Sequence, residues 1–300
     1  MKLKYKLIQI MLIGAALLYS SSAFASSLPS IAGEPPREAF TFLQKEVIYK
    51  VCAEGKSKVS TEPDCRSMKT GAAASGVLLR HYISPATDEK VSLILTAGHF
   101  CRDPAPLVPR DFNSSSGPKI LSAKVYWRYS AFDYLGKKYI VNKAIAKSGT
   151  TDLCLLESQY IDQEPIQISS SDLNYGDRIL NVGTPYALFM PPSIILDEGF
   201  YIGSVRDNGP MLMSDLVIGP GSSGSMVIQK QPLGWRLVGM VYAVILIDKP
   251  PVGKKGLVAE PLLALGATLK QIKDFIKYAE ESYLNGDYII SSINPYFKQV

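Results

Sequence analysis

The chain has 300 residues, of which 47% are hydrophobic and 20% are charged. This length and composition exclude a mini-protein held together mainly by disulfides, and they exclude an intrinsically disordered chain, which needs low hydrophobicity and high net charge. The formal net charge of +5 suggests a mildly basic protein until its distribution along the chain is considered.

The first 25 residues have the three parts of a secretory signal peptide. Three lysines precede the largely apolar run Leu7–Tyr19, and Ala23-Phe24-Ala25 places small residues where a signal peptidase cleaves. The alternative is an uncleaved anchor, but 13 residues fall short of the about 20 that span a membrane. We therefore expect a secreted or periplasmic protein with no membrane span after cleavage of residues 1–25.

Removal of that segment leaves 29 basic and 27 acidic side chains, so the mature chain is nearly neutral at +2. This balance gives no support for a nucleic-acid partner. The chain has two histidines and no C-x-x-C spacing, so neither a metal nor another cofactor is expected.

The segment that follows the signal peptide is predicted to contain a helix. Pro35-Pro36 precedes apolar residues at spacings of three and four, namely Phe40, Leu43, Val47, Ile48 and Val51, and proline is tolerated in the first turn of a helix. With the polar loop Ala53–Lys69, this segment forms a predicted N-terminal extension over residues 26–69.

From residue 72 the pattern changes to short β-branched and aromatic runs separated by Gly, Pro, Asn and Ser. The expected strands are Gly76–Leu79, Val91–Thr96, Lys124–Tyr129, Tyr139–Ala144, Leu153–Leu156, Arg178–Val182, Gly199–Val205, Met226–Gln229 and Arg236–Ala243. Many short strands at this spacing predict an all-β sandwich or a pair of barrels, which we assign to a domain over residues 70–260. A final helix is predicted over Pro261–Asn285, within a C-terminal segment of residues 261–300.

Three stretches place chemically useful side chains in this β context. A strand ends at His99 in Leu95–Cys101, Asp152 leads the strand Leu153–Leu156, and Ser223 lies in the glycine-flanked run Gly219–Ser225. A serine hydroxyl needs a neighbouring base to become a nucleophile, an imidazole suits that task near pH 7, and a carboxylate orients the imidazole. Glycines beside the serine allow the N–H groups of Gly221 and Ser223 to point at a developing oxyanion.

Chain order separates the hydrolase classes. Both histidines precede Ser223, which excludes the serine–acid–histidine order of an α/β-hydrolase for this serine. The aspartate–histidine–serine order of subtilisin stays open, since Asp64 and Asp88 precede His99, but that fold alternates helices with parallel strands. The order His99, Asp152, Ser223 is that of chymotrypsin.

These residues resemble the motifs of the chymotrypsin-fold serine proteases, most closely those of the bacterial trypsin-like and HtrA-type branch. Leu95–His99 is similar to the family's L-T-A-A-H motif with Gly98 for the second alanine, Asp152–Leu156 to D-[IL]-A-[LV]-[LI], and Asp215–Ser225 to D-A-A-I-N-P-G-N-S-G-G with Ser225 for the last glycine. Ser75-Gly76-Val77 and Tyr175–Pro185 resemble two further stretches. The resemblance covers residues 70–247 and implies two antiparallel six-stranded β-barrels, without a PDZ domain after them.

Carried over to this chain, the resemblance implies Ser223 as nucleophile, His99 as general acid and base, and Asp152 as the orienting carboxylate. It implies that Tyr242 and Val244 bind the main chain of a peptide or protein substrate by strand addition. Val217 stands six positions before Ser223, where relatives that cleave after Lys or Arg carry an acid, so the resemblance favours a small or aliphatic side chain in the specificity pocket.

Two alternatives accompany this hypothesis. Ser222 and Ser225 are rivals of Ser223 within the same run. A catalytically inactive scaffold that binds an extended peptide or a protein partner is the alternative to an exported serine endopeptidase, because fold does not imply function.

The four cysteines can pair in an oxidising compartment. Cys101 lies two residues after His99 and Cys154 two after Asp152, and residues two apart on a strand share a face. Because the proposed triad requires these segments to adjoin, we expect a Cys101–Cys154 bridge and a second bridge from Cys52 to Cys65. The alternative leaves Cys154 as a buried free thiol.

Overall fold

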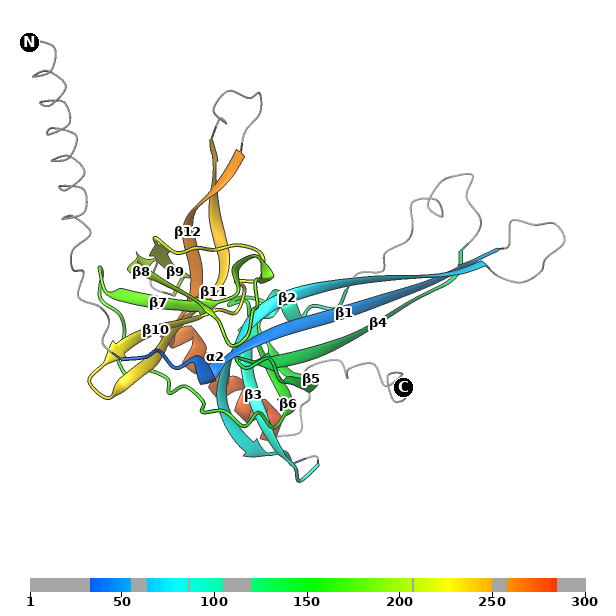
Figure 1. The fold of residues 1–300 in the computed structure, drawn as a ribbon, viewed down its shortest axis with the longest axis horizontal. Helices are drawn as coiled ribbons and strands as arrows, with labels where there is room; N and C mark the ends of the chain where they lie inside the picture. Colours follow the sequence, from blue (N-terminus) through cyan, green and yellow to red (C-terminus); the bar gives the residue numbers. More distant parts are fainter. Residues whose placement is uncertain are drawn as a thin grey trace, which may run out of the picture. The chain divides into compact units, whose positions relative to one another are not determined.

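The computed structural model describes residues 33–54, 64–85, 87–104, 120–206, 208–249 and 258–284, so the predicted signal peptide lies outside the described residues. The described chain folds into two closed six-stranded β-barrels, followed by the helix α2 (Figure 1). Paired strands run antiparallel in both barrels. The predicted pair of antiparallel six-stranded barrels with a C-terminal helix is confirmed.

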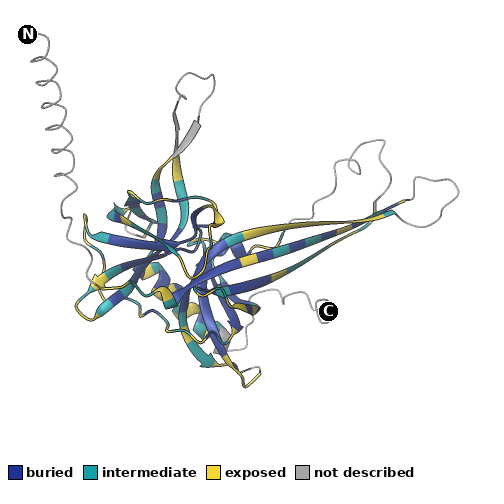
Figure 2. Cartoon of the chain, viewed as in Figure 1, coloured by how far each residue is buried: buried dark blue, intermediate teal, exposed yellow. Residues whose placement is uncertain are grey.

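The first barrel is built from the strands of the N-terminal half. In chain order they are β1 (Phe40–Ala53), β2 (Asp64–Ile83), β3 (Lys90–Ala97), β4 (Ile120–Asp133), β5 (Lys138–Lys147) and β6 (Leu153–Gln159). Around the barrel the order is β1-β2-β3-β6-β5-β4. Two 3-10 turns flank these strands, η1 (Arg37–Ala39) before β1 and η2 (Gly98–Cys101) after β3. Fully buried aliphatic side chains such as Leu43, Leu78, Ile94 and Leu156 fill the interior (Figure 2).

The second barrel repeats this arrangement. Its strands are β7 (Arg178–Gly183), β8 (Ile195–Ser204), β9 (Met211–Ser214), β10 (Met226–Gln231), β11 (Gly234–Lys249) and β12 (Val258–Thr268), with the 3-10 turn η4 (Pro185–Ala187) after β7. Around the barrel the order is β10-β11-β12-β9-β8-β7. Ile179, Met211, Met213, Val227 and Val238 form the centre of its core.

The predicted N-terminal helix is wrong, because residues 40–53 form strand β1. This strand pairs with β2 along its whole length, from Phe40↔Val77 to Ala53↔Asp64, and with β4 on its other edge. Its apolar residues occur at helical spacings and also at alternate positions, and tertiary pairing selects the strand because closure of the barrel requires it. The first barrel therefore includes residues that the sequence assigned to an N-terminal extension.

The predicted C-terminal helix begins eight residues too early. Pro261–Thr268 belongs to strand β12, and helix α2 spans Leu269–Leu284. Thr268 and Gln271 form a capping box: the Gln271 N–H donates to Thr268 Oγ1 at 3.2 Å and the Thr268 N–H to Gln271 Oε1 at 2.9 Å. Within the described segments, no helix combines the length and apolarity needed to cross a membrane.

We expect the substitution Gly76→Ala in β2 to lower the free energy of unfolding by about 1–3 kcal/mol, the cost of overpacking a core. A Cβ at this position would lie 2.5 Å from Thr41 Oγ1 and 2.8 Å from Ile94 Cγ2. Urea denaturation measures the change. Gly149→Ala is the matched control, since a Cβ there meets nothing within 4 Å. A loss at Gly76 no greater than that at Gly149 would contradict the packing described here.

Candidate active site

His99 and Asp152 are brought together by the pairing of β3 with β6. Ala97 at the end of β3 pairs with Leu153 at the start of β6, and the Gly98 N–H donates to the Asp152 carbonyl oxygen at 2.6 Å. The His99 ring then lies with Nδ1 2.6 Å from Asp152 Oδ2. A Cβ on residue 98 would stand 2.9 Å from the Asp152 carbonyl carbon, which explains why glycine suits this position where the resembling motif has alanine.

The charge of Asp152 is stabilised in this position. Burial raises the pKa of its carboxyl, but the hydrogen bond and the charge of His99 outweigh burial, and Arg102 adds to them, so the pKa lies below its ordinary value. Burial also raises the pKa of the Tyr242 hydroxyl, and the negative charge of Asp152 raises it further. Tyr242 therefore lies within the electrostatic field of Asp152.

Two disulfides are present, Cys52–Cys65 between β1 and β2 and Cys101–Cys154 beside the His99–Asp152 pair. Both match the pairing expected from the sequence. Cys101 and Cys154 are almost completely buried, with 2% and 0% of their surfaces exposed. Their bridge covalently joins the turn that carries His99 to the strand that follows Asp152.

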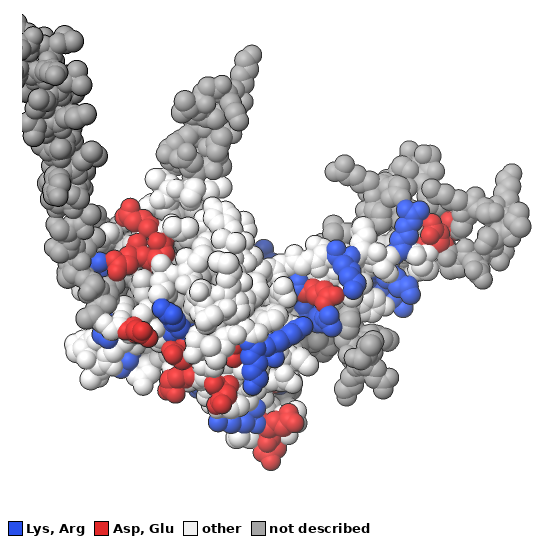
Figure 3. Space-filling model, in the orientation of Figure 1, with Lys and Arg blue, Asp and Glu red and all other residues white. Residues whose placement is uncertain are grey.

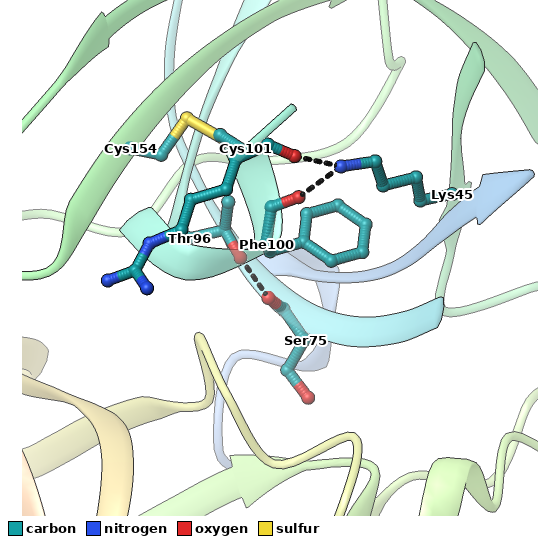
Figure 4. The surroundings of a disulfide bond; sticks show 7 residues. Lys45, Ser75, Thr96, Phe100, Cys101 and Cys154 are labelled. Carbon is teal, nitrogen blue, oxygen red and sulfur yellow. Dashed lines mark hydrogen bonds between the residues drawn. A yellow bond between two sulfur atoms is a disulfide. The ribbon is translucent and has the colours of Figure 1, made fainter. Parts of the chain in front are cut away.

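Lys45 of β1 is a buried residue of this site that the sequence did not reveal. Its ammonium donates to the Phe100 carbonyl oxygen at 3.3 Å and to the carbonyl oxygen of Arg102 (Figure 4). Burial lowers the pKa of Lys45 to about 8, although the negative charge of Asp103 raises it, and the positive charge of Lys147 lowers it further. Lys45 and the Cys101–Cys154 bridge thus hold the His99 turn from two sides. The misassigned helix concealed this role, because a lysine on an amphipathic helix is expected to face solvent.

Ser223 lies in a turn of the second barrel that is bonded to the first. The Ser75 N–H of β2 donates to the Ser223 carbonyl oxygen at 2.8 Å, and the Ser75 hydroxyl donates to the Gly221 carbonyl oxygen at 3.0 Å. The Thr184 N–H donates to Ser75 Oγ at 3.0 Å. Ser75, which is completely buried, therefore joins β2, the end of β7 and the Ser223 turn.

Gly224 brings the same turn against the strand that leads to His99. Its φ of +87° suits glycine, and a Cβ there would lie 2.0 Å from the Ser75 carbonyl oxygen and 2.4 Å from Thr96 Oγ1. Thr96, three residues before His99, donates its hydroxyl to the same Ser75 oxygen at 2.7 Å. Ser223 and His99 are thus carried by segments in direct contact, although no hydrogen bond joins their side chains among the described residues.

The three serines of the run differ in their surroundings. Ser222 and Ser225 are buried, with 1% and 0% of their surfaces exposed. The Ser222 hydroxyl accepts the Gly219 N–H at 3.2 Å, and Ser225 Oγ is enclosed without a hydrogen-bond partner among the described residues. Ser223 is partly exposed and lines a pocket of about 400 Å³.

The peptide groups around Ser223 are oriented by their partners. The Ala187 N–H donates to the Pro220 carbonyl oxygen at 3.0 Å. Because a trans peptide places its C=O and N–H on opposite sides, the Gly221 N–H points away from Ala187. Neither this N–H nor that of Ser223 has an intramolecular acceptor within the described segments.

The pocket beside Ser223 is largely apolar. Its walls come from the Ser223 turn, β11, β12 and η4, and they are formed by Tyr186, Ile218, Gly219, Pro220, Ser222, Ser223, Val241, Tyr242, Ala243, Val244, Leu246 and Pro261. Tyr242 and Val244 line it, as the sequence predicted. Val217 does not line it: its side chain is 51% exposed, its N–H donates to Asp197 Oδ2, and the next residue, Ile218, lines the pocket instead.

Tyr186, Leu246 and Pro261 are site residues that the sequence analysis missed. Tyr186 approaches because Gly219 has no side chain, and a Cβ there would lie 2.9 Å from the Tyr186 ring. Leu246 and Pro261 are opposite each other on β11 and β12. No local pattern identifies such residues, since each acts through a neighbour distant in sequence. Among the described residues, no group of three or more His, Cys, Asp and Glu could hold a metal ion.

Comparison with known proteins gives a family match and solved structures of low sequence identity. The sequence model of the family of trypsin-like peptidase domains matches residues 74–240, whereas no curated protein matches the chain. The crystal structure of the serine endoprotease from Yersinia pestis has a TM-score of 0.46 and 16% identity, covering 79% of this chain and 62% of that one. A variant of the HtrA-type protease AlgW with a decapeptide has a TM-score of 0.48 and 13% identity, covering 81% and 64%. This chain spans less than two thirds of the length of either structure.

The depressed pKa of Asp152 predicts a contribution to acid stability. The pKa of the Asp152 carboxyl is lower in the folded protein than its ordinary value. Ionised Asp152 therefore stabilises the folded state at pH values above the ordinary pKa, and this stabilisation is lost as the pH falls through the folded-state pKa. We expect the free energy of unfolding, measured with urea between pH 7 and about pH 3, to fall less in Asp152→Asn than in the wild type. The exposed Asp172 supplies the control Asp172→Asn, which should follow the wild type. Parallel curves for all three proteins would refute the prediction.

Removal of the Cys101–Cys154 bridge is expected to cost about 2–5 kcal/mol of stability. The cost should exceed that of removing Cys52–Cys65 by about 1 kcal/mol, because the bridged residues are 53 apart in the first pair and 13 apart in the second. Urea denaturation of the two double alanine variants makes the comparison. Equal losses, or a larger loss for Cys52–Cys65, would contradict it.

Proposed function

The chain belongs to the trypsin-like peptidase domain family, and we propose that it is a serine endopeptidase that hydrolyses peptide bonds through an acyl-enzyme on Ser223, His99 and Asp152. The observation that carries this proposal is the 2.6 Å hydrogen bond between His99 Nδ1 and Asp152 Oδ2. A histidine oriented by a carboxylate, on a segment packed against a serine at a pocket, is the arrangement that nucleophilic catalysis by serine requires.

The hydrogen bond to Asp152 assigns separate roles to the two ring nitrogens of His99. Nδ1 donates its proton to the carboxylate, which leaves Nε2 as the base. In the proposed reaction the Ser223 Oγ forms a bond to the peptide carbonyl carbon while its proton moves to Nε2. The peptide C–N bond then breaks and the amine leaves with that proton. Water, deprotonated by Nε2, finally attacks the acyl carbon. The bond from that carbon to Ser223 Oγ then breaks, and Oγ takes the proton back from Nε2. Within the described part of the free protein, no hydrogen bond joins the side chains of Ser223 and His99. We expect this bond to form when substrate binds, because catalytic hydrogen bonds often tighten on binding.

The N–H groups of Gly221 and Ser223 are the proposed donors to the negatively charged oxygen of the tetrahedral intermediate. The Ala187–Pro220 hydrogen bond supports this role, because it fixes the peptide plane that contains the Gly221 N–H. Such donors act at the point where charge develops, and the loss of one commonly costs about 2.7–4 kcal/mol of transition-state stabilisation.

The pocket favours an aliphatic residue immediately before the cleaved bond. Its described lining contains Ile218, Val241, Val244 and Leu246 and no charged side chain. A Lys or Arg side chain would lose its hydration there without an opposite charge in compensation. An apolar side chain would instead gain free energy from burial.

An extracytoplasmic location is part of the proposal. The two disulfides are compatible with an oxidising compartment, since cytosolic thiols are kept reduced. The signal peptide expected at residues 1–25 supports secretion or residence in the periplasm.

The central prediction concerns Ser223→Ala. This variant is expected to lose labelling by a fluorophosphonate probe and to lower kcat for peptide hydrolysis by a factor of about 10⁶, because the attacking oxygen is absent. Ser170→Ala, at an exposed serine, is the control and should label like the wild type. Unchanged labelling of Ser223→Ala would refute the assignment. A wild-type protein that binds peptides without labelling or hydrolysis would favour the inactive scaffold.

A further inference from the structure

Strand β11 continues well beyond the point where its neighbour β10 ends. β10 pairs with β11 from Gln231↔Gly234 to Met226↔Met240, and the last bonds on this edge join Val241 to Gly224 and Ser225 at 2.7 and 3.0 Å. On its other edge β11 stays paired with β12 as far as Lys249↔Val258. Within the described segments, the edge of β11 after Val241 therefore has no strand beside it.

A proline in β12 shows which residues present their main chain to that edge. Pro261 pairs with Leu246, and proline has no N–H to donate to the Leu246 carbonyl oxygen. Two residues opposite each other in a regular antiparallel pair either exchange two N–H to C=O hydrogen bonds, or each directs its N–H and C=O away from the other strand. The register shifts between Ile245 and Leu246, but the extra residue, Leu262, lies in β12, so the alternation within β11 continues. Leu246 therefore directs its N–H and C=O away from β12, and the alternation gives Val244 and Asp248 the same orientation.

The surface at Ile245 and Leu246, on this part of β11, is apolar and open. Ile245 and Leu246 are 37% and 53% exposed, and Leu246 with Pro261 extends the wall of the Ser223 pocket beyond Val244. On the face shown in Figure 3, the base of the β11–β12 hairpin carries neither Lys, Arg, Asp nor Glu at its surface. An unpaired strand edge is a template for another strand, and an apolar edge next to a catalytic pocket suits an extended polypeptide.

We propose that the edge of β11 from Val244 to Asp248 is an extended substrate-binding site, which pairs with a polypeptide strand reaching about seven residues upstream of the cleaved bond. This inference rests on the proposed function and on the expected binding of the substrate main chain by Tyr242 and Val244, which we assign to the first and third residues upstream of the cleaved bond. Antiparallel pairing then sets the fifth residue opposite Leu246 and the seventh opposite Asp248. The substrate class is an extended chain whose fifth upstream residue is apolar, because opposite side chains share a face and meet Leu246 and Pro261 there.

The first test uses peptides with valine before the cleaved bond and alternating valine and threonine upstream, of three, five, seven or nine upstream residues. Binding to Ser223→Ala is followed by fluorescence anisotropy, and kcat/KM is measured with the wild type. We expect both affinity and kcat/KM to rise about tenfold from three to seven residues, through the hydrogen bonds added at Leu246 and Asp248, and to stay level from seven to nine.

N-methylation of the peptide isolates the main-chain contacts without changing the protein. In the seven-residue peptide, methylation of the fifth nitrogen removes the N–H that faces the Leu246 carbonyl oxygen and should weaken binding about fivefold. Methylation of the fourth nitrogen is the matched control, since that N–H points away from β11. Equal effects of the two methyl groups would overturn the pairing.

The outcomes separate this inference from the proposed function. Hydrolysis with no dependence on upstream length would overturn the extended site and leave the peptidase assignment intact. Binding that depends on length, without hydrolysis by the wild type, would support the extended site and refute the catalytic assignment. If no peptide binds, the extended site is overturned. This outcome includes the case in which a second copy of this chain occupies the edge.

Discussion

Ser75 joins the two barrels where the candidate active site is assembled, and the geometry of that site depends on its contacts. Closed barrels satisfy the backbone groups of their strands internally, but the turns between strands need other partners when they are buried. The Ser223 turn finds them in the opposite barrel: Ser75 binds the carbonyl oxygens of Ser223 and Gly221 and accepts the Thr184 N–H. The position of Ser223 is therefore set by the first barrel as much as by the second.

The first barrel holds His99 with comparable constraint. The β3–β6 pairing and the Cys101–Cys154 bridge fix the distance from His99 to Asp152, while Lys45 binds the carbonyl groups that follow His99. Two positions without a side chain, Gly98 and Gly224, allow the backbones to approach this closely. A rigid site of this kind contrasts with the open edge of β11, where the described chain leaves space for a strand to be added.

The sequence predicted the elements whose patterns are local. Apolar runs bounded by turn residues identified β3, β6 and β10. The sequence motifs placed His99 after the first of these strands, Asp152 before the second and Ser223 before the third. The same reasoning failed for β1, because its sequence fits both a helical and an alternating pattern, and pairing with β2 and β4 decides between them. It also failed for residues 261–268, where a proline that is tolerated within β12, opposite Leu246, was interpreted as the start of a helix.

Motif, order and spacing were thus enough to predict the fold class, and they supplied the candidate triad and the expected cysteine pairing, since each depends on residue types at positions fixed along the chain. The tertiary structure alone distinguished the three serines of the run, because Ser222 and Ser225 are buried whereas Ser223 is partly exposed at the pocket. It also placed Ile218 rather than Val217 in the pocket wall, and it revealed Lys45 and the free edge of β11. These features arise from contacts between residues far apart in the chain, and no periodicity within a single strand encodes them.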